Sequence, residues 1–328
     1  MTLKTCFFYQ PSYRRVANAL AARGLDVSPL LMDAEGRVWR QGEPVDMTTA
    51  APDLAWVSPD AFIDGQFELF MSRVLDAPSL DWMQSGAAGY DHPLFSALMA
   101  KGVRLSNSDA PSVSIAEYVL AGVLDHFQNG PARRAAQRDT LWRPAPCREI
   151  AGTNWLVIGF GAIGARVARR ARAFEARVTA VRRHPSANAN ADADRVIGPG
   201  ELAAHLPHAD VVVLAAPLND QTAGMVGADF LARLKSGAVL VNVARGGLID
   251  EAALLAGLDR DQPGHAVLDV FQQEPLPSDS PFWRHPKVAL TAHVSGMGSG
   301  LSARSDALFL DNLARYLAGE NPVNLVNG

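Results

Sequence analysis

Three short segments of the chain carry residues that could do acid–base chemistry on a small organic acid. They read NVARGGLID (242–250), DVFQQEPLP (269–277) and TAHVSG (291–296), each at the end of an apolar run, and they supply Arg245, Glu274 and His293. A guanidinium can hold a carboxylate and polarise a carbonyl, an imidazolium can protonate a forming alkoxide, and a carboxylate can orient the imidazole and raise its pKa. Hydride transfer to a 2-keto acid requires this set of groups.

A glycine-rich turn predicts a dinucleotide site. Residues 159–164 read GFGAIG, which matches G-x-G-x-x-G, follows an apolar strand and opens a helical pattern. In that context Gly159 permits a tight turn, Gly161 lets the backbone approach a pyrophosphate, and Gly164 lets helix and strand pack closely. The alternative is a turn that serves packing only.

The end of the next strand indicates which dinucleotide would bind. After the strand 178–181 come Arg182 and Arg183, and no acid follows until Asp192. A carboxylate there would bond the ribose hydroxyls of NAD, whereas guanidinium groups accommodate a 2′-phosphate through charge-assisted hydrogen bonds. The sequence therefore predicts NADP(H) as the preferred cofactor, with NAD(H) still possible. The alternative is a pair of solvated loop arginines.

Composition excludes several classes of protein. The chain has 328 residues, 48% apolar and 20% charged, which is globular and long enough for two domains. Its 30 Lys and Arg against 34 Asp and Glu give a net charge of −4, so no nucleic-acid partner is expected. Cys6 and Cys147 are too few for a disulfide framework, and no stretch is apolar enough for a membrane span. A cytoplasmic protein is predicted.

Short apolar runs alternate with helical patterns along the chain, which predicts an α/β protein with two doubly wound parallel sheets. Strands are expected near 5–9, 54–57 and 80–84, and a clearer series begins at 155. The last helix, 303–318, is expected to cross back to the first domain. The predicted domains are therefore 1–103 with 296–328, and 104–295.

In their order and spacing, GFGAIG, NVARGGLIDE, LDVFQQEPLP and TAHVSG resemble the D-isomer-specific 2-hydroxyacid dehydrogenases. This resemblance covers essentially the whole chain. It implies a Rossmann cofactor domain and a discontinuous, flavodoxin-like substrate domain. It also implies that Arg245, Glu274 and His293 are catalytic.

The resemblance further implies contacts for cofactor, substrate and partner subunit. The implied cofactor contacts are Ala162, Ile163, Arg182, Arg183, Ala216, Pro217, Thr222, Val243, Ala244 and Asp269, the last approaching the nicotinamide carboxamide. The implied carboxylate-binding loop, rich in small residues, contains Gly86, Ala87, Ala88 and Gly89. Trp142 resembles a tryptophan that some glyoxylate- and hydroxypyruvate-reducing members insert into a neighbour's active site; packing at a dimer interface is the alternative. The helix 113–127 either docks a second subunit of a homodimer, as in the family, or is core.

Three functions from different classes stay open at this stage. The first is reduction of a glyoxylate- or hydroxypyruvate-like 2-keto acid to the D-2-hydroxy acid by NADPH. The second is a relative such as phosphoglycerate dehydrogenase or formate dehydrogenase. Formate dehydrogenases, however, have Gln at the position of Glu274, and a phosphorylated substrate would favour a cationic recognition loop, which residues 85–91 do not provide. The third is a dinucleotide-sensing, corepressor-like protein. No metal site is predicted, because His205 and His208 have no evident third ligand.

Overall fold

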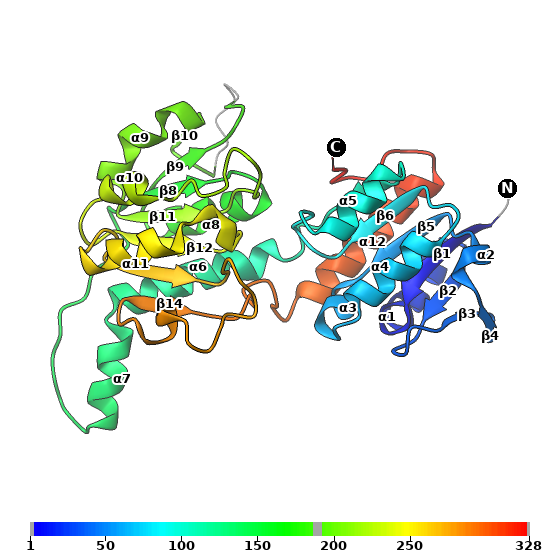
Figure 1. The fold of residues 1–328 in the computed structure, drawn as a ribbon, viewed down its shortest axis with the longest axis horizontal. Helices are drawn as coiled ribbons and strands as arrows, with labels where there is room; N and C mark the ends of the chain where they lie inside the picture. Colours follow the sequence, from blue (N-terminus) through cyan, green and yellow to red (C-terminus); the bar gives the residue numbers. More distant parts are fainter. Residues whose placement is uncertain (1–2, 186–191, 327–328) are drawn as a thin grey trace. The chain divides into compact units, whose positions relative to one another are not determined.

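The computed structural model describes residues 3–185 and 192–326, and the chain forms two compact units (Figure 1). Unit 1 comprises Met1–Pro111 and Ser299–Gly328, and unit 2 comprises Ser112–Gly298. The sequence placed the two changes of domain at 104 and 296. Unit 1 is thus built from both ends of the chain.

Unit 1 contains a sheet with the strand order β4-β3-β2-β1-β5-β6-β7. Its helices and strands are, in chain order, β1 (Lys4–Tyr9), α1 (Gln10–Ala22), β2 (Val27–Met32), β3 (Val38–Arg40), β4 (Glu43–Val45), α2 (Met47–Ala50), β5 (Leu54–Val57), α3 (Pro59–Ile63), α4 (Phe67–Asp76), β6 (Trp82–Ser85), α5 (Pro93–Ala100), β7 (Arg104–Ser106) and α12 (Leu301–Leu317). The strands β2-β1-β5-β6-β7 run parallel, which is the flavodoxin-like order.

Both faces of this sheet are buried, because successive side chains of a strand point to opposite faces. In β1, Phe7 packs with residues of α4 and α5 on one face, and Phe8 packs with residues of α1 and α12 on the other. On the second face the ring of Phe309 from α12 stacks on Trp56, with centroids 4.3 Å apart. The last helix therefore completes the core that the first hundred residues begin.

An antiparallel hairpin, β3–β4, extends the parallel sheet of unit 1 at one edge. Its two-residue turn, Gln41-Gly42, has positive φ at both positions (52° and 89°), as the type I′ turn of a tight hairpin requires. Pro44 lies in the edge strand, where its missing N–H costs no ladder hydrogen bond. An all-parallel sheet was expected here, so the hairpin is an addition to the predicted fold.

Unit 2 contains a sheet with the order β10-β9-β8-β11-β12-β13-β14, in which every paired strand is parallel. Its elements are α6 (Ser112–Phe127), α7 (Gly130–Arg138), β8 (Asn154–Ile158), α8 (Ala162–Ala173), β9 (Arg177–Val181), β10 (Arg195–Ile197), α9 (Leu202–His205), β11 (Val211–Leu214), α10 (Ala228–Ala232), β12 (Val239–Asn242), α11 (Glu251–Asp259), β13 (His265–Leu268) and β14 (Val288–Leu290). The strand order reverses between β8 and β11, and ligands of such sheets bind beyond the strand ends at that point.

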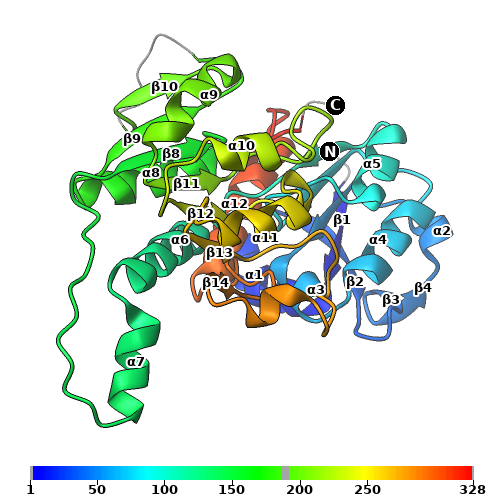
Figure 2. The ribbon, with the colours of Figure 1, turned by 60° about the vertical axis from the view of Figure 1, so that its left-hand side comes forward.

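Helices cover both faces of the unit 2 sheet (Figure 2). On one face α6 and α8 pack together against the sheet, and α10 and α11 pack on the other. Ile115, Val119 and Val123 of α6 are buried in the first of these cores. Core packing therefore accounts for much of the apolar character of α6. Within the described residues, no helix has the length and apolarity needed to cross a membrane.

Candidate active site

The glycine-rich turn lies at the point where the strand order of unit 2 reverses. Gly159 has a φ of +98°, and a Cβ there would lie 2.4 Å from the backbone between Ala215 and Ala216, at the end of β11. A Cβ on Gly164 would lie 2.0 Å from the carbonyl oxygen of Gly159. Both positions therefore require glycine, because a side chain would clash with fixed backbone.

Gly161 differs from these two glycines, because a Cβ there would meet nothing within 4 Å. Gly161 is the N-cap of α8, no side chain caps this helix, and both Gly161 and Ala162 are exposed. The first amides of α8 thus point to open space that a Cβ would enter, at the positive end of the helix dipole. Such an arrangement fits a dinucleotide pyrophosphate.

The two arginines after β9 are both exposed. The backbone amide of Arg182 donates to Ile197, and within the described residues neither the Arg182 nor the Arg183 guanidinium has an ion-pair partner. Their positive charge is therefore open to an anionic ligand at the carboxyl end of β9.

The remaining implied cofactor residues lie at or after the ends of β11 and β12. Ala216, Val243 and Ala244 are buried, so what they offer a ligand is backbone rather than side chain. The hydroxyl of Thr222 bonds the carbonyl of Pro217 at 2.7 Å and closes the loop after β11.

Arg245 follows β12 and is placed by a close approach of two backbones. A Cβ on Gly246 would lie 1.9 Å from the carbonyl carbon of Phe271, so only glycine lets this loop contact the one after β13. The buried side chain of Asn242 shapes the same loop, because it accepts from the Ala244 amide at 3.1 Å and donates to the Arg245 carbonyl at 2.9 Å. Sequence reasoning did not single out Asn242.

His293 and Glu274 form a direct pair, with 2.8 Å between His293 Nδ1 and Glu274 Oε2. The hydrogen bond to Glu274 raises the pKa of His293 above its ordinary value, against an opposing effect of burial. Burial would raise the pKa of Glu274, but hydrogen bonds from His293 and the Phe271 amide, with Arg245 nearby, hold it below its ordinary value. The pair therefore favours an imidazolium beside a carboxylate.

Asp269 holds the segment that carries His293. Its buried carboxylate accepts from the amides of Val294 and Ser295 at 2.9 and 3.0 Å and is bonded to the Thr291 hydroxyl at 2.6 Å. His293 itself has a φ of +54°, which is uncommon for a residue other than glycine. The Asp269 carboxylate thus fixes the backbone on both sides of an unusual conformation.

In unit 1, the loop after β6 divides into two halves. The amide of Gly86 donates to Val57 and that of Ala87 to the Ser85 hydroxyl, so both are used within the unit. The amides of Ala88 and Gly89 donate to no described residue, and both residues are partly exposed. Two adjacent free N–H groups can bind a carboxylate. Of the four residues that the sequence proposed, these two carry that geometry.

Comparisons with known proteins assign the chain to a family. The sequence profile of the D-isomer specific 2-hydroxyacid dehydrogenase NAD binding domain matches residues 120–295. A glyoxylate/hydroxypyruvate reductase A of Salmonella choleraesuis is 31% identical over 292 residues, which are 88% of this chain and 88% of that protein. The chain belongs to the D-isomer-specific 2-hydroxyacid dehydrogenases. It is therefore an NAD(P)-dependent dehydrogenase, as the motifs predicted.

Solved structures agree with the two-unit architecture of this dehydrogenase. A D-isomer specific 2-hydroxyacid dehydrogenase family protein from Aeromonas salmonicida is similar with a TM-score of 0.80 at 27% identity, covering 99% of each chain. An NADPH-dependent glyoxylate/hydroxypyruvate reductase from Sinorhizobium meliloti, in complex with NADP and sulfate, has a TM-score of 0.77 at 26% identity. That match covers 99% of this chain and 98% of the other. The predicted fold class is confirmed.

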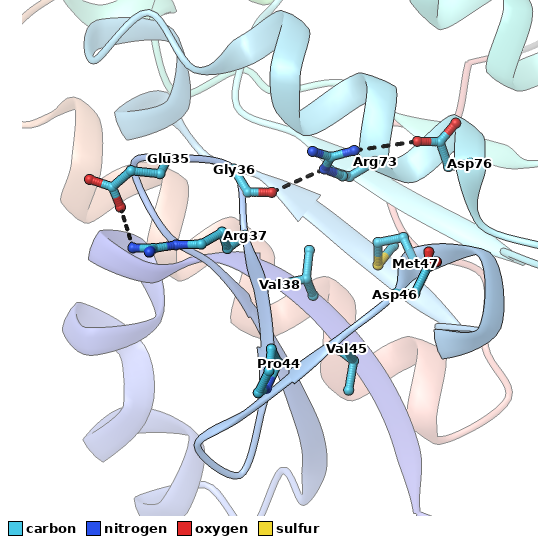
Figure 3. A pocket seen from close by; sticks show the side chains of 10 residues that line it. All are labelled: Glu35, Gly36, Arg37, Val38, Pro44, Val45, Asp46, Met47, Arg73 and Asp76. Carbon is cyan, nitrogen blue, oxygen red and sulfur yellow. Dashed lines mark hydrogen bonds and ion pairs between the residues drawn. The ribbon is translucent and has the colours of Figure 1, made fainter.

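A hollow of about 300 Å³ lies beside the β3–β4 hairpin of the dehydrogenase (Figure 3). Its two guanidinium groups are engaged: Arg37 pairs with Asp33 and Glu35, and Arg73 donates to the Gly36 carbonyl. We assign this hollow no chemistry. In the part of the chain that the structure describes, no three His, Cys, Asp or Glu side chains group as metal ligands.

Replacing Glu274 by Gln in this dehydrogenase is expected to move the pH limb of keto-acid reduction to lower pH. With His293 as the predicted proton donor, reduction uses its imidazolium form, so activity is expected below the raised pKa of His293 and should be lost as pH rises through it. Gln keeps the shape but removes the charge that raises this pKa, and moderate activity should survive. The measurement is kcat against pH across the neutral range.

Glu251→Gln is the matched control for this substitution. Glu251 also accepts a loop amide, from Gln272 at 2.7 Å, but the carboxylate bonded to His293 is Glu274. The pH limb of the Glu251→Gln variant should stay at the wild-type pH. If the limb of Glu274→Gln also stays there, the carboxylate does not set the protonation of His293.

Proposed function

We propose that this dehydrogenase reduces a small 2-keto acid, glyoxylate- or hydroxypyruvate-like, to the D-2-hydroxy acid with NADPH. The observation that carries the proposal is the His293–Glu274 pair at 2.8 Å, in a chain that also carries the family's cofactor turn. A histidine held as imidazolium by a carboxylate is a proton donor for a forming alkoxide. The Salmonella and Sinorhizobium relatives are named as glyoxylate/hydroxypyruvate reductases, which supports this substrate class.

In this proposal the steps of the reaction are divided among the named residues. The nicotinamide cofactor supplies the hydride when bound. Arg245 binds the substrate carboxylate and polarises the carbonyl, since its guanidinium lies close enough to lower the pKa of both Glu274 and His293. His293 gives the proton to the alkoxide oxygen, and Glu274 orients the ring. The free amides of Ala88 and Gly89 hold the substrate carboxylate.

The cofactor preference rests on Arg182 and Arg183. Both are exposed at the end of β9, and no carboxylate follows this strand directly. A relative from Xanthobacter autotrophicus was solved in complex with NADPH, at 28% identity and a TM-score of 0.78, and the Sinorhizobium relative was solved with NADP. We propose that the two guanidinium groups bind the 2′-phosphate and that Ala162, Ile163 and the loops after β11 and β12 hold the rest. A contact from Asp269 to the carboxamide stays a prediction.

Turnover of NADPH with glyoxylate, hydroxypyruvate, pyruvate and phenylpyruvate tests the function, each also run with NADH. Reduction of glyoxylate or hydroxypyruvate, faster with NADPH than with NADH, is the expected result. Nucleotide binding without turnover of any acid would favour the dinucleotide-sensing alternative. A phosphorylated keto acid is added to the panel, and turnover of that acid alone would favour a phosphoglycerate dehydrogenase.

We further propose that the protein is a homodimer. Residues 130–147, which we call the arm, comprise α7 and the segment after it, and they extend away from the unit 2 sheet (Figure 1). Trp142 on the arm is 99% exposed and Leu141 is 49% exposed. Adjacent exposed apolar side chains of this size fit a surface covered by a second copy. There Trp142 either enters the neighbour's site or packs in the interface.

Light scattering at micromolar concentration is expected to give twice the mass of the chain. If α6 lies in the two-fold interface, Ala121→Arg on its exposed side should shift the protein towards monomer. Ala203→Arg, equally exposed on α9, is the control that should leave the mass unchanged. A monomeric wild type would contradict the proposal.

We place the enzyme in the cytoplasm, where reducing conditions suit its two unpaired cysteines, Cys6 and Cys147. Cys147 is exposed, so in an oxidising compartment its thiol would be open to oxidation.

A further inference from the structure

Two buried amide side chains in unit 1 are bonded to each other. Gln84 lies in β6 and is 1% exposed, and Asn312 lies in α12 and is fully buried. Asn312 Nδ2 donates to Gln84 Oε1 at 2.7 Å. Leaving a buried polar group unpaired costs about 1–3 kcal/mol, so burying two amides at one place demands that their partners be fixed.

Gln84 is also bonded to the backbone at the ends of β6 and β7. Its Nε2 group donates to the carbonyl oxygens of Ser85 at 2.9 Å and of Asn107 at 3.0 Å. Ser85 is the last residue of β6, directly before the loop, and Asn107 begins the loop after β7. A single side chain therefore ties together the starting points of both loops.

The two loops are also joined further along. Asn107 Nδ2 donates to the carbonyl of Ala88 at 2.8 Å, and the Ser108 amide donates to the carbonyl of Ala87 at 2.9 Å. These bonds use the carbonyl groups of the loop and leave the N–H groups of Ala88 and Gly89 free. The loop after β7 thus fixes which way the free amides point.

The segment 323–326 is held by the Asn312 side chain and by the backbone at the end of β7. Val323 donates its amide to Asn312 Oδ1 at 2.7 Å, and the Asn107 amide donates to the carbonyl of Asn324 at 3.0 Å. Val326 then pairs with the backbone of Leu105 at 2.8 Å. This segment of the chain consequently borders the loop after β7.

We propose that Gln84 and Asn312 are positioning residues that aim the Ala88 and Gly89 amides at the substrate carboxylate, with segment 323–326 as part of the same device. The inference rests on the proposed function, in which those amides bind the carboxylate. Neither side chain contacts substrate. Gln84 acts by holding the carbonyl groups of Ser85 and Asn107, and the Asn107 side chain in turn holds the Ala88 carbonyl. Asn312 acts by holding the Gln84 side chain.

The variants Gln84→Met and Asn312→Leu remove the amides and keep approximately the same volume. Each is expected to raise KM for the keto acid about 10-fold, as for a weakened hydrogen bond to a charged group. The change in kcat should be smaller, and KM for NADPH should not change, because the cofactor turn lies in unit 2. KM for both substrates and kcat are measured on the full chain with NADPH.

Two further variants keep the test decisive. Phe309→Leu, also buried on α12, is the control that should lower the unfolding temperature without changing KM for the keto acid. Asn107→Asp keeps the size of a partly exposed side chain and removes the donor to Ala88, so it reports on the same device if the buried variants do not fold. It should raise the same KM.

Ala88→Pro removes one loop amide directly and separates the possible failures. If it raises KM for the keto acid while Gln84→Met, Asn312→Leu and Asn107→Asp stay at the wild-type value, the positioning role is overturned and the carboxylate loop stands. If Ala88→Pro leaves KM unchanged in an enzyme that reduces keto acids, the loop does not bind the carboxylate and the inference falls with it. If Phe309→Leu raises KM for the keto acid equally, the rise in the other variants reflects general destabilisation and the positioning role is overturned.

Discussion

His293→Ala is expected to lower kcat for keto-acid reduction about 10²–10⁴-fold, the usual contribution of a positioned acid–base group. The His293 side chain is 49% exposed, so the alanine leaves no large internal cavity. The hydrogen bond from the His293 amide to the Asp269 carbonyl, 2.8 Å long, is made by backbone and can persist. Single-turnover and steady-state kinetics would both show the loss.

NADPH binding should stay nearly intact in that variant, because in the described residues the side-chain hydrogen bond of His293 goes to Glu274 and not to the cofactor turn at Gly159–Gly164. A titration of NADPH followed by fluorescence provides the control. If His293→Ala keeps most of its kcat and also keeps the pH limb, another group donates the proton. The assignment of the acid would then be wrong.

The double substitution Arg182→Ala with Arg183→Ala is expected to raise KM for NADPH about 10²-fold. This corresponds to the loss of one or two charge-assisted hydrogen bonds to a phosphate, at about 1.5–3 kcal/mol. NADH has no 2′-phosphate, so its KM should change little. The measured quantity is kcat/KM with NADPH divided by kcat/KM with NADH. This ratio should fall towards or below one.

Arg169→Ala with Arg233→Ala is a matched control for this experiment. Both side chains are exposed in unit 2, and their removal changes the net charge by the same amount. A general electrostatic effect on an anionic cofactor would appear in both double variants. Equal losses for NADPH and NADH in the Arg182 and Arg183 variant would remove the phosphate assignment.

The sequence was most informative where one local pattern decided the structure. Continuous apolar runs such as 211–214 and 239–241 are buried on both faces, and each forms a parallel strand as predicted. The roles of Gly159, Gly161 and Gly164 were predicted from their spacing together with the strand before them and the helix after them, and the first and last lie where a Cβ would clash. The pairing of His293 with Glu274 was also predicted, because both residues follow strands that end at one edge of a sheet.

Features that depend on distant residues were not predicted. The hairpin of β3 and β4 has only three residues in each strand and a Gln-Gly turn, which is too weak a local signal. The helix between β10 and β11 is a single turn, Leu202–His205, followed by a 3-10 turn that contains Pro207. Asn242 and Gln84 are polar residues within or at the end of strands, and their roles appear only when the opposing backbone is placed.

The discontinuity of unit 1 has a consequence for the order in which the enzyme folds during synthesis. Unit 2 is contiguous, so its core can close as soon as residue 298 has left the ribosome. The first 111 residues emerge earlier, but one face of their sheet still lacks α12, the helix that carries Phe309. Trp56 therefore has no stacking partner until α12 has been synthesised. We therefore expect the segment made first to be the last to reach its final packing, and to be the part of the nascent chain that relies most on chaperones.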